Sequence, residues 1–155
     1  MDLRSVMTQL KAWEHPKMRA VNAKHGAGDN QFGVNLSTLR GLAGTIKRDH
    51  ALALELWKSG NIDAMNLAIL IMDPKQLTQP EVERLAKDLS YYTTTGWFVK
   101  NAVKASTRPP LMLLILHDML RDRGFKGRGA HAAPVHRRSQ ADAEARSRSV
   151  PLGWR

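Results

Sequence analysis

Apolar residues recur at helical spacing through the first 120 residues of the chain. Near the N-terminus the spacing is i, i+3, i+4 and i+7, which predicts an amphipathic helix on the apolar positions Leu3, Val6, Met7, Leu10 and Trp13. A second stripe follows Asn35 or Ser37, at Leu39, Leu42, Ala43 and Ile46. The segment "NIDAMNLAILIMD" begins at Asn61 and is apolar almost all round, so we expect it to be buried on several sides.

Residues typical of helix ends stand at the borders of these stripes. Asp2 and Asp49 precede apolar stripes as N-cap residues do, because their carboxylates can accept hydrogen bonds from free backbone N–H groups. Pro16 suits the first turn of a second helix, since its fixed φ matches helical geometry. Thr78 and Glu81 have the spacing of a capping box. These signals predict several short helices with short connections.

No segment of useful length alternates apolar and polar residues as a β-strand does. Short connections favour antiparallel packing of neighbouring helices, and helix pairs of about forty residues are typical of HEAT-type solenoids. There is no clear internal sequence repeat. The periodicity alone therefore predicts only an all-α helical array over residues 1–120, and the short connections add the antiparallel pairing.

The composition changes near residue 121. Residues 1–120 contain nine Lys and six Arg, whereas residues 121–155 contain one Lys and eight Arg and have no sustained apolar period. We expect residues 121–155 to form a basic, disordered tail. An out-of-frame extension of a truncated domain is the alternative, and the sequence does not separate the two.

The formal net charge is +10 and the isoelectric point is about 10.4, which favours a polyanionic partner. Nucleic acid is the first candidate, and an acidic membrane surface is the second. The excess charge is uneven, because residues 1–120 carry a net +4 and residues 121–155 a net +6. The charge of the helical part alone is therefore weak evidence for DNA binding.

Several kinds of chemistry lack their sequence signals. The absence of cysteine excludes disulfides and thiolate metal sites, and fits the reducing cytoplasm, where we expect the protein to be. The glycines of "GAGDNQFG" are wrongly spaced for a phosphate loop, and there is no H-E-x-x-H or G-x-S-x-G pattern. The N-terminus lacks a signal-peptide core, and Leu111–Leu116 is too short to cross a bilayer. We therefore expect no metal, no cofactor and no membrane partner.

The stretch "SYYTTTGWFVKNAVK", residues 90–104, places a tryptophan beside lysines. A helix over residues 95–106 puts four side chains on one polar face, namely Trp97, Lys100, Asn101 and Lys104. The opposite face is the predicted core stripe of Phe98, Val99, Ala102 and Val103. Trp97 then either packs against a neighbouring helix or stacks on nucleic acid, with ammonium groups near the phosphates.

The segment "QFGVNLSTLRGLAGTIKRDHALALELWKSGNIDAMNLAILIMDPKQLT" resembles the N-terminal half of the HEAT-like-repeat DNA alkylation repair glycosylases, and "YYTTTGWFVKNAVK" is similar to their central helix. The resemblance covers roughly residues 1–106. It implies a HEAT-like solenoid with a concave, basic face that holds duplex DNA. It also implies excision of cationic N3- or N7-alkylated purines without a metal or another cofactor.

The resemblance also suggests individual site residues. Trp97 falls on a tryptophan that contacts the deoxyribose of the lesion, Asn35 falls near a polar residue close to the DNA, and Arg40 matches a basic residue. Asn101 stands where the family pattern W-x-x-x-D has its catalytic aspartate. A neutral amide stabilises a cationic sugar less than a carboxylate does, at an expected cost of about 10²–10³ in rate.

Three interpretations follow from the sequence. The first is a DNA repair protein that binds duplex DNA through Asn35, Arg40, Lys100 and Lys104 and excises alkylpurines with Trp97 and Asn101 as its catalytic pair. The second is an inactive, truncated HEAT-like module that binds DNA or protein. The third is an interaction scaffold without any nucleic-acid role. The lesion preference and the oligomeric state stay open.

Overall fold

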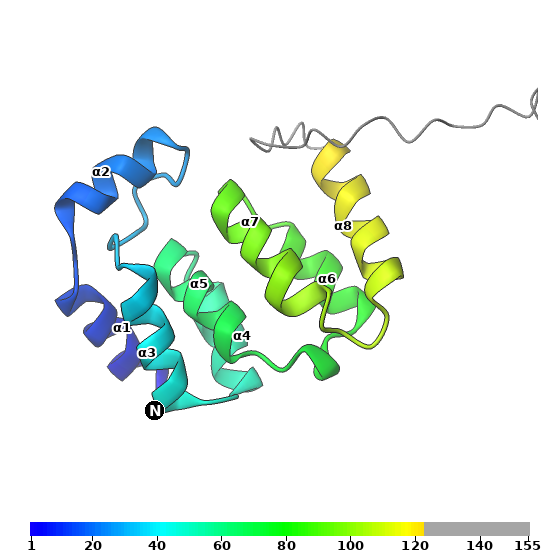
Figure 1. Cartoon of the computed structure of the whole chain (residues 1–155), viewed down its shortest axis with the longest axis horizontal. Helices are drawn as coiled ribbons and strands as arrows, with labels where there is room; N and C mark the ends of the chain where they lie inside the picture. The colour runs from blue at the N-terminus through cyan, green and yellow to red at the C-terminus, as the bar shows by residue number, and fades with distance from the viewer. Residues whose placement is uncertain (123–155) are drawn as a thin grey trace, which may run out of the picture.

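The structure is a computed structural model that describes residues 1–122, and every regular element in that range is helical (Figure 1). The all-α prediction is thereby confirmed. In chain order the α-helices are α1 (Leu3–Ala12), α2 (Pro16–Lys24), α3 (Leu36–Ile46), α4 (His50–Lys58), α5 (Ile62–Ile71), α6 (Gln79–Ala86), α7 (Tyr92–Phe98) and α8 (Pro109–Asp122). A 3₁₀ turn, η1 (Pro74–Gln76), follows α5, and a π-helical turn, η2 (Val99–Val103), continues α7.

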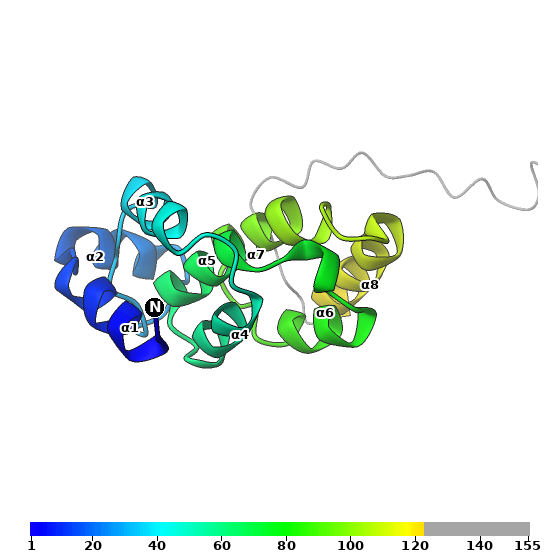
Figure 2. The same cartoon turned by 90° about the horizontal axis from the view of Figure 1, so that it is seen from below.

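The helices form two layers of a HEAT-like array. Helices α3, α5 and α7 lie along one side, and α1, α4 and α6 along the other, as Figure 2 shows. Helix α5 is the centre of the array, because it packs against α4, α3 and α7 and only Leu70 among its residues is less than fully buried. The prediction that this segment is buried on several sides is confirmed.

The predicted helix ends are largely confirmed. The Asp2 carboxylate accepts a hydrogen bond from the Ser5 N–H at 2.8 Å, and the Thr78–Glu81 capping box is present at the start of α6. Trp13 is a correction, because α1 ends at Ala12 and the Trp13 side chain is 40% exposed. The chain leaves helical geometry at Trp13, so this side chain departs from the buried stripe.

The predicted helix over residues 95–106 is also corrected. Helix α7 begins three residues earlier, at Tyr92, and its α-helical geometry ends at Phe98, where the π turn η2 follows. The early start depends on a tertiary contact, since the Thr94 hydroxyl donates to Asn66 Oδ1 of α5 at 2.9 Å. In η2 the Lys104 N–H bonds to the Val99 carbonyl at 3.0 Å, five residues back.

The predicted boundary between the helical domain and the tail falls inside α8. This helix continues to Asp122, two residues beyond the boundary that the sequence suggests. The rest of the predicted tail, residues 123–155, lies outside the described residues.

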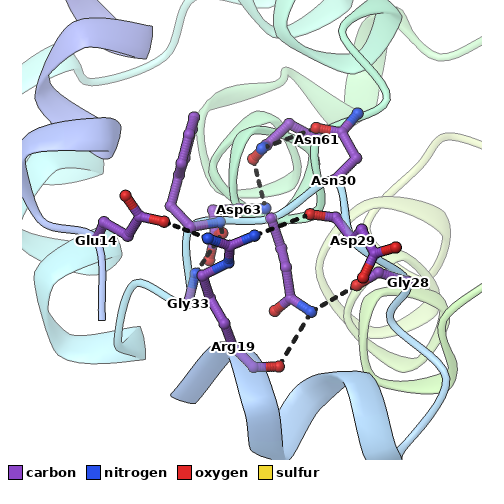
Figure 3. A network of polar contacts seen from close by, with 10 residues as sticks. Glu14, Arg19, Gly28, Asp29, Asn30, Gly33, Asn61 and Asp63 are labelled. Carbon is purple, nitrogen blue, oxygen red and sulfur yellow. Dashed lines mark hydrogen bonds and ion pairs between the residues drawn. The ribbon is translucent and has the colours of Figure 1, made fainter. Parts of the chain in front are cut away.

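The loop between α2 and α3 is attached to α5 by one carboxylate. Asp63, which is 2% exposed, accepts three backbone hydrogen bonds, from Phe32 at 2.6 Å and from Gly33 and Val34 at 3.0 Å each (Figure 3). The glycine-rich segment is thus a structural loop, whose N–H groups are directed at a side chain of its own chain. Asn30 adds to this attachment, because its side chain donates to the Ser59 carbonyl and accepts from Asn61.

Helix α2 lies directly against this loop at Gly33. A Cβ at Gly33 would meet the Arg19 nitrogen at 2.7 Å and the His15 carbonyl oxygen at 2.8 Å, and φ is +76°. Only glycine fits such a close approach at that backbone angle. The Gln31 side chain completes the contact by donating to the carbonyls of Arg19 and Gly28.

We expect Asp63→Asn to lower the free energy of unfolding by about 3 kcal/mol, because the amide presents one acceptor where three N–H groups converge on two. Urea unfolding measures this change. Asp29→Asn is the matched control, since Asp29 is exposed in the same loop and should change stability by about 0.5 kcal/mol or less. Equal effects of the two substitutions would contradict the assigned role of Asp63.

The pH dependence of this effect has a defined sign. Burial raises the pKa of the Asp63 carboxyl above its ordinary value, while the backbone N–H groups of Phe32, Gly33 and Val34 lower it to a smaller extent. The folded state therefore binds this proton more tightly than the unfolded state, and the associated stability is lost as pH rises through the folded pKa. We expect Asp63→Asn to be more destabilising at about pH 4 than at about pH 7, and a difference that grows with pH would show that the hydrogen bonds from the loop outweigh burial in setting this pKa.

Candidate nucleic-acid interface

Arg40 of α3 and Trp97 of α7 meet on the side of the array that α3, α5 and α7 form. The Arg40 guanidinium carbon lies 5.9 Å from the centroid of the Trp97 ring, which is within the range of a cation–π contact. Trp97 is half-buried and packs against the hydrophobic core. The interpretation in which Trp97 packs against neighbouring helices is confirmed, whereas its stacking on nucleic acid stays a prediction.

Asn35 fixes the start of the helix that carries Arg40. Its Oδ1 accepts from the Thr38 N–H at 2.9 Å and from the hydroxyls of Thr38 and Ser37 at 2.9 and 2.6 Å. These bonds make Asn35 the N-cap of α3. Asn35 is exposed, so a contact with DNA stays a prediction beside this structural role.

Asn101 is coupled to Trp97 through the backbone. Its Nδ2 donates to the Trp97 carbonyl oxygen at 3.0 Å, one turn earlier, and the side chain is half-buried. The amide therefore stabilises the junction between α7 and the π turn. It carries no charge, so it can offer a nearby cation only a dipole.

Lys100 of η2 and Lys104, the C-cap residue that follows η2, are exposed cations. The buried side of the same segment holds Phe98, Ala102 and Val103, so the predicted division into a polar and an apolar face survives the change from α to π geometry. Val99 is the exception, because it is half-buried. Within residues 1–122 neither lysine forms an ion pair, which leaves both available to an anionic partner.

Other kinds of site find little support in the described part of the chain. Among residues 1–122 no three His, Asp or Glu side chains lie close enough together to hold a metal ion. In the same range no helix has both the length and the apolar character needed to span a bilayer.

Comparison with known proteins identifies the family. Residues 6–122 match the model of the DNA alkylation repair enzymes. The chain belongs to this family. A solved structure from a family of proteins related to the HEAT-like repeat DNA glycosylases, with affinity for branched DNA structures, superposes with a TM-score of 0.66 and 29% sequence identity over 70% of the chain. The predicted family and the predicted HEAT-like fold are therefore confirmed.

Two curated relatives of this chain are uncharacterized proteins of Listeria. Lin0241 of Listeria innocua is 30% identical and Lmo0209 of Listeria monocytogenes 28% identical, each over 81 residues that make up 50% of this chain. The matched region is 36% of each relative. The chain likewise covers 46% of the solved structure.

The structure brings some of the predicted site residues together and also shows two that the sequence reasoning missed. Arg40, Trp97 and Asn101 are linked by direct contacts, whereas Asn35 lies at the N-terminal end of α3. Asp63 and Asn66 are the missed residues. Their signal was present, because each is a polar residue inside an otherwise apolar segment and a buried polar group requires a partner.

We expect Trp97→Ala to lower the free energy of unfolding by about 2 kcal/mol, roughly half the usual value for a fully buried tryptophan. Trp97→Phe keeps an aromatic body and should cost about 1 kcal/mol or less. Trp13→Ala is the matched control at an exposed tryptophan and should cost about 0.5 kcal/mol or less. Urea unfolding measures all three, and a loss at Trp97 no larger than at Trp13 would show that the indole is not packed on the core.

Proposed function

We propose that this chain binds duplex DNA, with little sequence preference, through the surface formed by Arg40, Trp97, Lys100 and Lys104, here called the Arg40–Trp97 surface. The observation that carries the proposal is the cation–π contact between the Arg40 guanidinium and the half-buried Trp97 indole, with the exposed Lys100 and Lys104 on the segment that follows. An aromatic face suits a sugar or an unpaired base, and cations suit phosphates. None of these groups reads base edges in an evident pattern, so the expected affinity is largely electrostatic.

The comparisons support this proposal. The family is one of DNA alkylation repair enzymes, and the solved relative comes from proteins with affinity for branched DNA structures. We extend that affinity to the present chain as part of the proposal. The chain spans less than half of the solved relative, so the activity of the whole relative is a separate question.

Salt dependence tests the binding surface. Each phosphate contact contributes about 0.9 to the slope of log affinity against log salt, which makes one contact worth about eightfold at about 0.1 M salt. We expect Arg40→Gln and Lys100→Gln each to weaken duplex binding by about that factor and to lower the slope by about 0.9. Fluorescence anisotropy of the full-length chain with a labelled duplex measures both quantities.

Lys58→Gln is the matched control for these two substitutions. Lys58 is an exposed lysine at the end of α4, in the opposite layer, and its removal changes the net charge by the same amount. Equal losses in all three variants would assign the binding to net charge instead of this surface. A salt slope near zero for the unchanged chain would exclude the proposal.

Excision of cationic N3- or N7-alkylated purines is the second candidate function. It is favoured by Trp97, which is half-buried and stands at the position that the family pattern gives to a lesion-contacting tryptophan. Asn101 weakens the candidate, since it supplies an amide whose Nδ2 is already bonded to the Trp97 carbonyl. An oxocarbenium-like transition state gains positive charge, and a carboxylate would stabilise that charge more strongly.

Asn101→Asp is the direct test of excision. The introduced carboxylate oxygens are repelled by the Trp97 carbonyl oxygen, so we expect them to lose this contact and turn away from it. We expect purine release from methylated duplex DNA to rise by about 10²–10³ if the rest of the site is competent. Asn101→Ala is the control, because it removes the same hydrogen bond to the Trp97 carbonyl without adding charge, and it should not increase purine release. Absence of a gain in a folded, DNA-binding Asn101→Asp variant excludes the excision function for this chain.

A further inference from the structure

Lys47, at the end of α3, has a backbone conformation that lysine rarely adopts. It is the C-cap residue of α3, with φ +65° and ψ −150°, and is the one non-glycine residue with positive φ in residues 1–122. This region of backbone space is occupied almost only by glycine, because a Cβ is strained there. Strained residues of this kind persist where the surrounding structure holds them, and they cluster at sites that bind ligands.

The residues that follow Lys47 are fastened to the C-terminal end of α5. The Asp49 N–H donates to the Ile71 carbonyl oxygen at 2.9 Å. Arg48 Nη1 donates to the Met72 carbonyl oxygen at 2.9 Å, so this guanidinium already has a partner in the protein. The turn between α3 and α4 is therefore held by its neighbours, and the point from which the Lys47 side chain leaves the backbone is fixed with it.

Lys47 shares a hollow with Arg40. The hollow has a volume of about 410 Å³, lies between α3 and the C-terminal end of α5, and is lined by Arg40, Ala43, Gly44, Lys47, Arg48 and Leu70. Arg40 and Lys47 are seven residues apart, or about 10 Å along the axis of α3. A Cβ built on Gly44, which stands between them in the sequence, would meet nothing within 4 Å. The space beside the two cations is therefore open to a ligand.

The charge of Lys47 is not compensated by the protein. Its side chain is exposed and forms no ion pair within residues 1–122, and no carboxylate lines the hollow. A lysine at the C-terminal end of a helix gains from the helix dipole, but that gain is generally smaller than the strain of a conformation suited to glycine. The dipole therefore does not account for lysine at this position, whereas an anionic ligand beside Arg40 does.

We propose that Lys47 contacts the same duplex phosphate backbone as Arg40, and that its strained conformation places the ammonium group for this contact. The inference rests on the DNA binding proposed above and extends the Arg40–Trp97 surface to the end of α3. Each strand of a duplex carries one phosphate for about every 3.4 Å of its axis, so two cations about 10 Å apart can reach phosphates of one strand. Glycine at position 47 would accordingly give a protein that is at least as stable and that binds DNA more weakly.

Three substitutions separate the charge of Lys47 from its backbone strain. Lys47→Gly removes both, Lys47→Gln removes the charge alone, and Lys47→Arg keeps both. We expect Lys47→Gly and Lys47→Gln each to weaken binding to a linear duplex by about eightfold at about 0.1 M salt, and to lower the slope of log affinity against log salt by about 0.9. Lys47→Arg should stay within about twofold of the unchanged chain. The melting temperature of Lys47→Gly should be equal to or above that of the unchanged chain, because only glycine relieves the strain.

Fluorescence anisotropy of the full-length chain with a labelled duplex measures the affinities, and Lys58→Gln is the matched control in the opposite layer. Losses in Lys47→Gly and Lys47→Gln no larger than the loss in Lys58→Gln would overturn the proposal, because net charge alone would explain them. A lower melting temperature for Lys47→Gly would also overturn it, because lysine would then serve the stability of the turn. Failure of the proposed function is distinguishable, since in that case the unchanged chain shows a salt slope near zero or Arg40→Gln also loses no more than Lys58→Gln.

Discussion

Three neighbouring backbone N–H groups of the loop before α3 converge on the carboxylate of Asp63, and the arrangement of the candidate interface depends on this interaction. The loop has no helix or strand of its own to satisfy these groups, and an unpaired buried N–H costs about 1–3 kcal/mol. The carboxylate of Asp63 offers two acceptor oxygens to them. Burial raises the pKa of this carboxyl, and the three N–H bonds partly offset that rise. The bonds to Phe32, Gly33 and Val34 end just before Asn35, so they set where α3 begins and thus where Arg40 stands.

Helix α5 positions both sides of the Arg40–Trp97 surface although it contributes almost none of that surface itself. Asp63 and Asn66 are three residues apart on α5, and therefore lie on one side of it, about one turn apart. Asp63 attaches the loop that leads into α3, and Asn66 accepts the bond from Thr94 that starts α7 early. The two polar residues of this buried apolar helix thus fix the relative positions of Arg40 and Trp97, which are 57 positions apart in the sequence.

Local patterns predicted the helices, their caps and the core stripe well, because periodicity and capping depend on residues a few positions apart. The prediction that Trp13 belongs to the buried stripe was wrong, since α1 ends at Ala12, and Pro16 three residues later was a local signal of that end. The π turn after Phe98 was not predicted, because helix faces are assigned with the 100° rotation per residue of an α-helix, whereas a π turn has i to i+5 hydrogen bonds and a different rotation. The contact between Arg40 and Trp97 depends on the packing of α3 and α7 about α5, so no pattern within either helix contains it.

Asn101 decides between two uses of the same surface. A carboxylate at this position would help a cationic transition state, but it would also place a negative charge next to Lys100 and close to bound phosphates, and so weaken ground-state binding. The amide has the opposite effect: it stabilises a cationic transition state less, but it places no negative charge near Lys100 and Lys104. Its Nδ2 also donates a hydrogen bond to the backbone carbonyl of Trp97. The residues present at the Arg40–Trp97 surface therefore fit the proposed DNA binding better than the cleavage of a glycosidic bond. A surface that holds DNA gains from further phosphate contacts, and Lys47, which lines a hollow together with Arg40, lies where such a contact would continue.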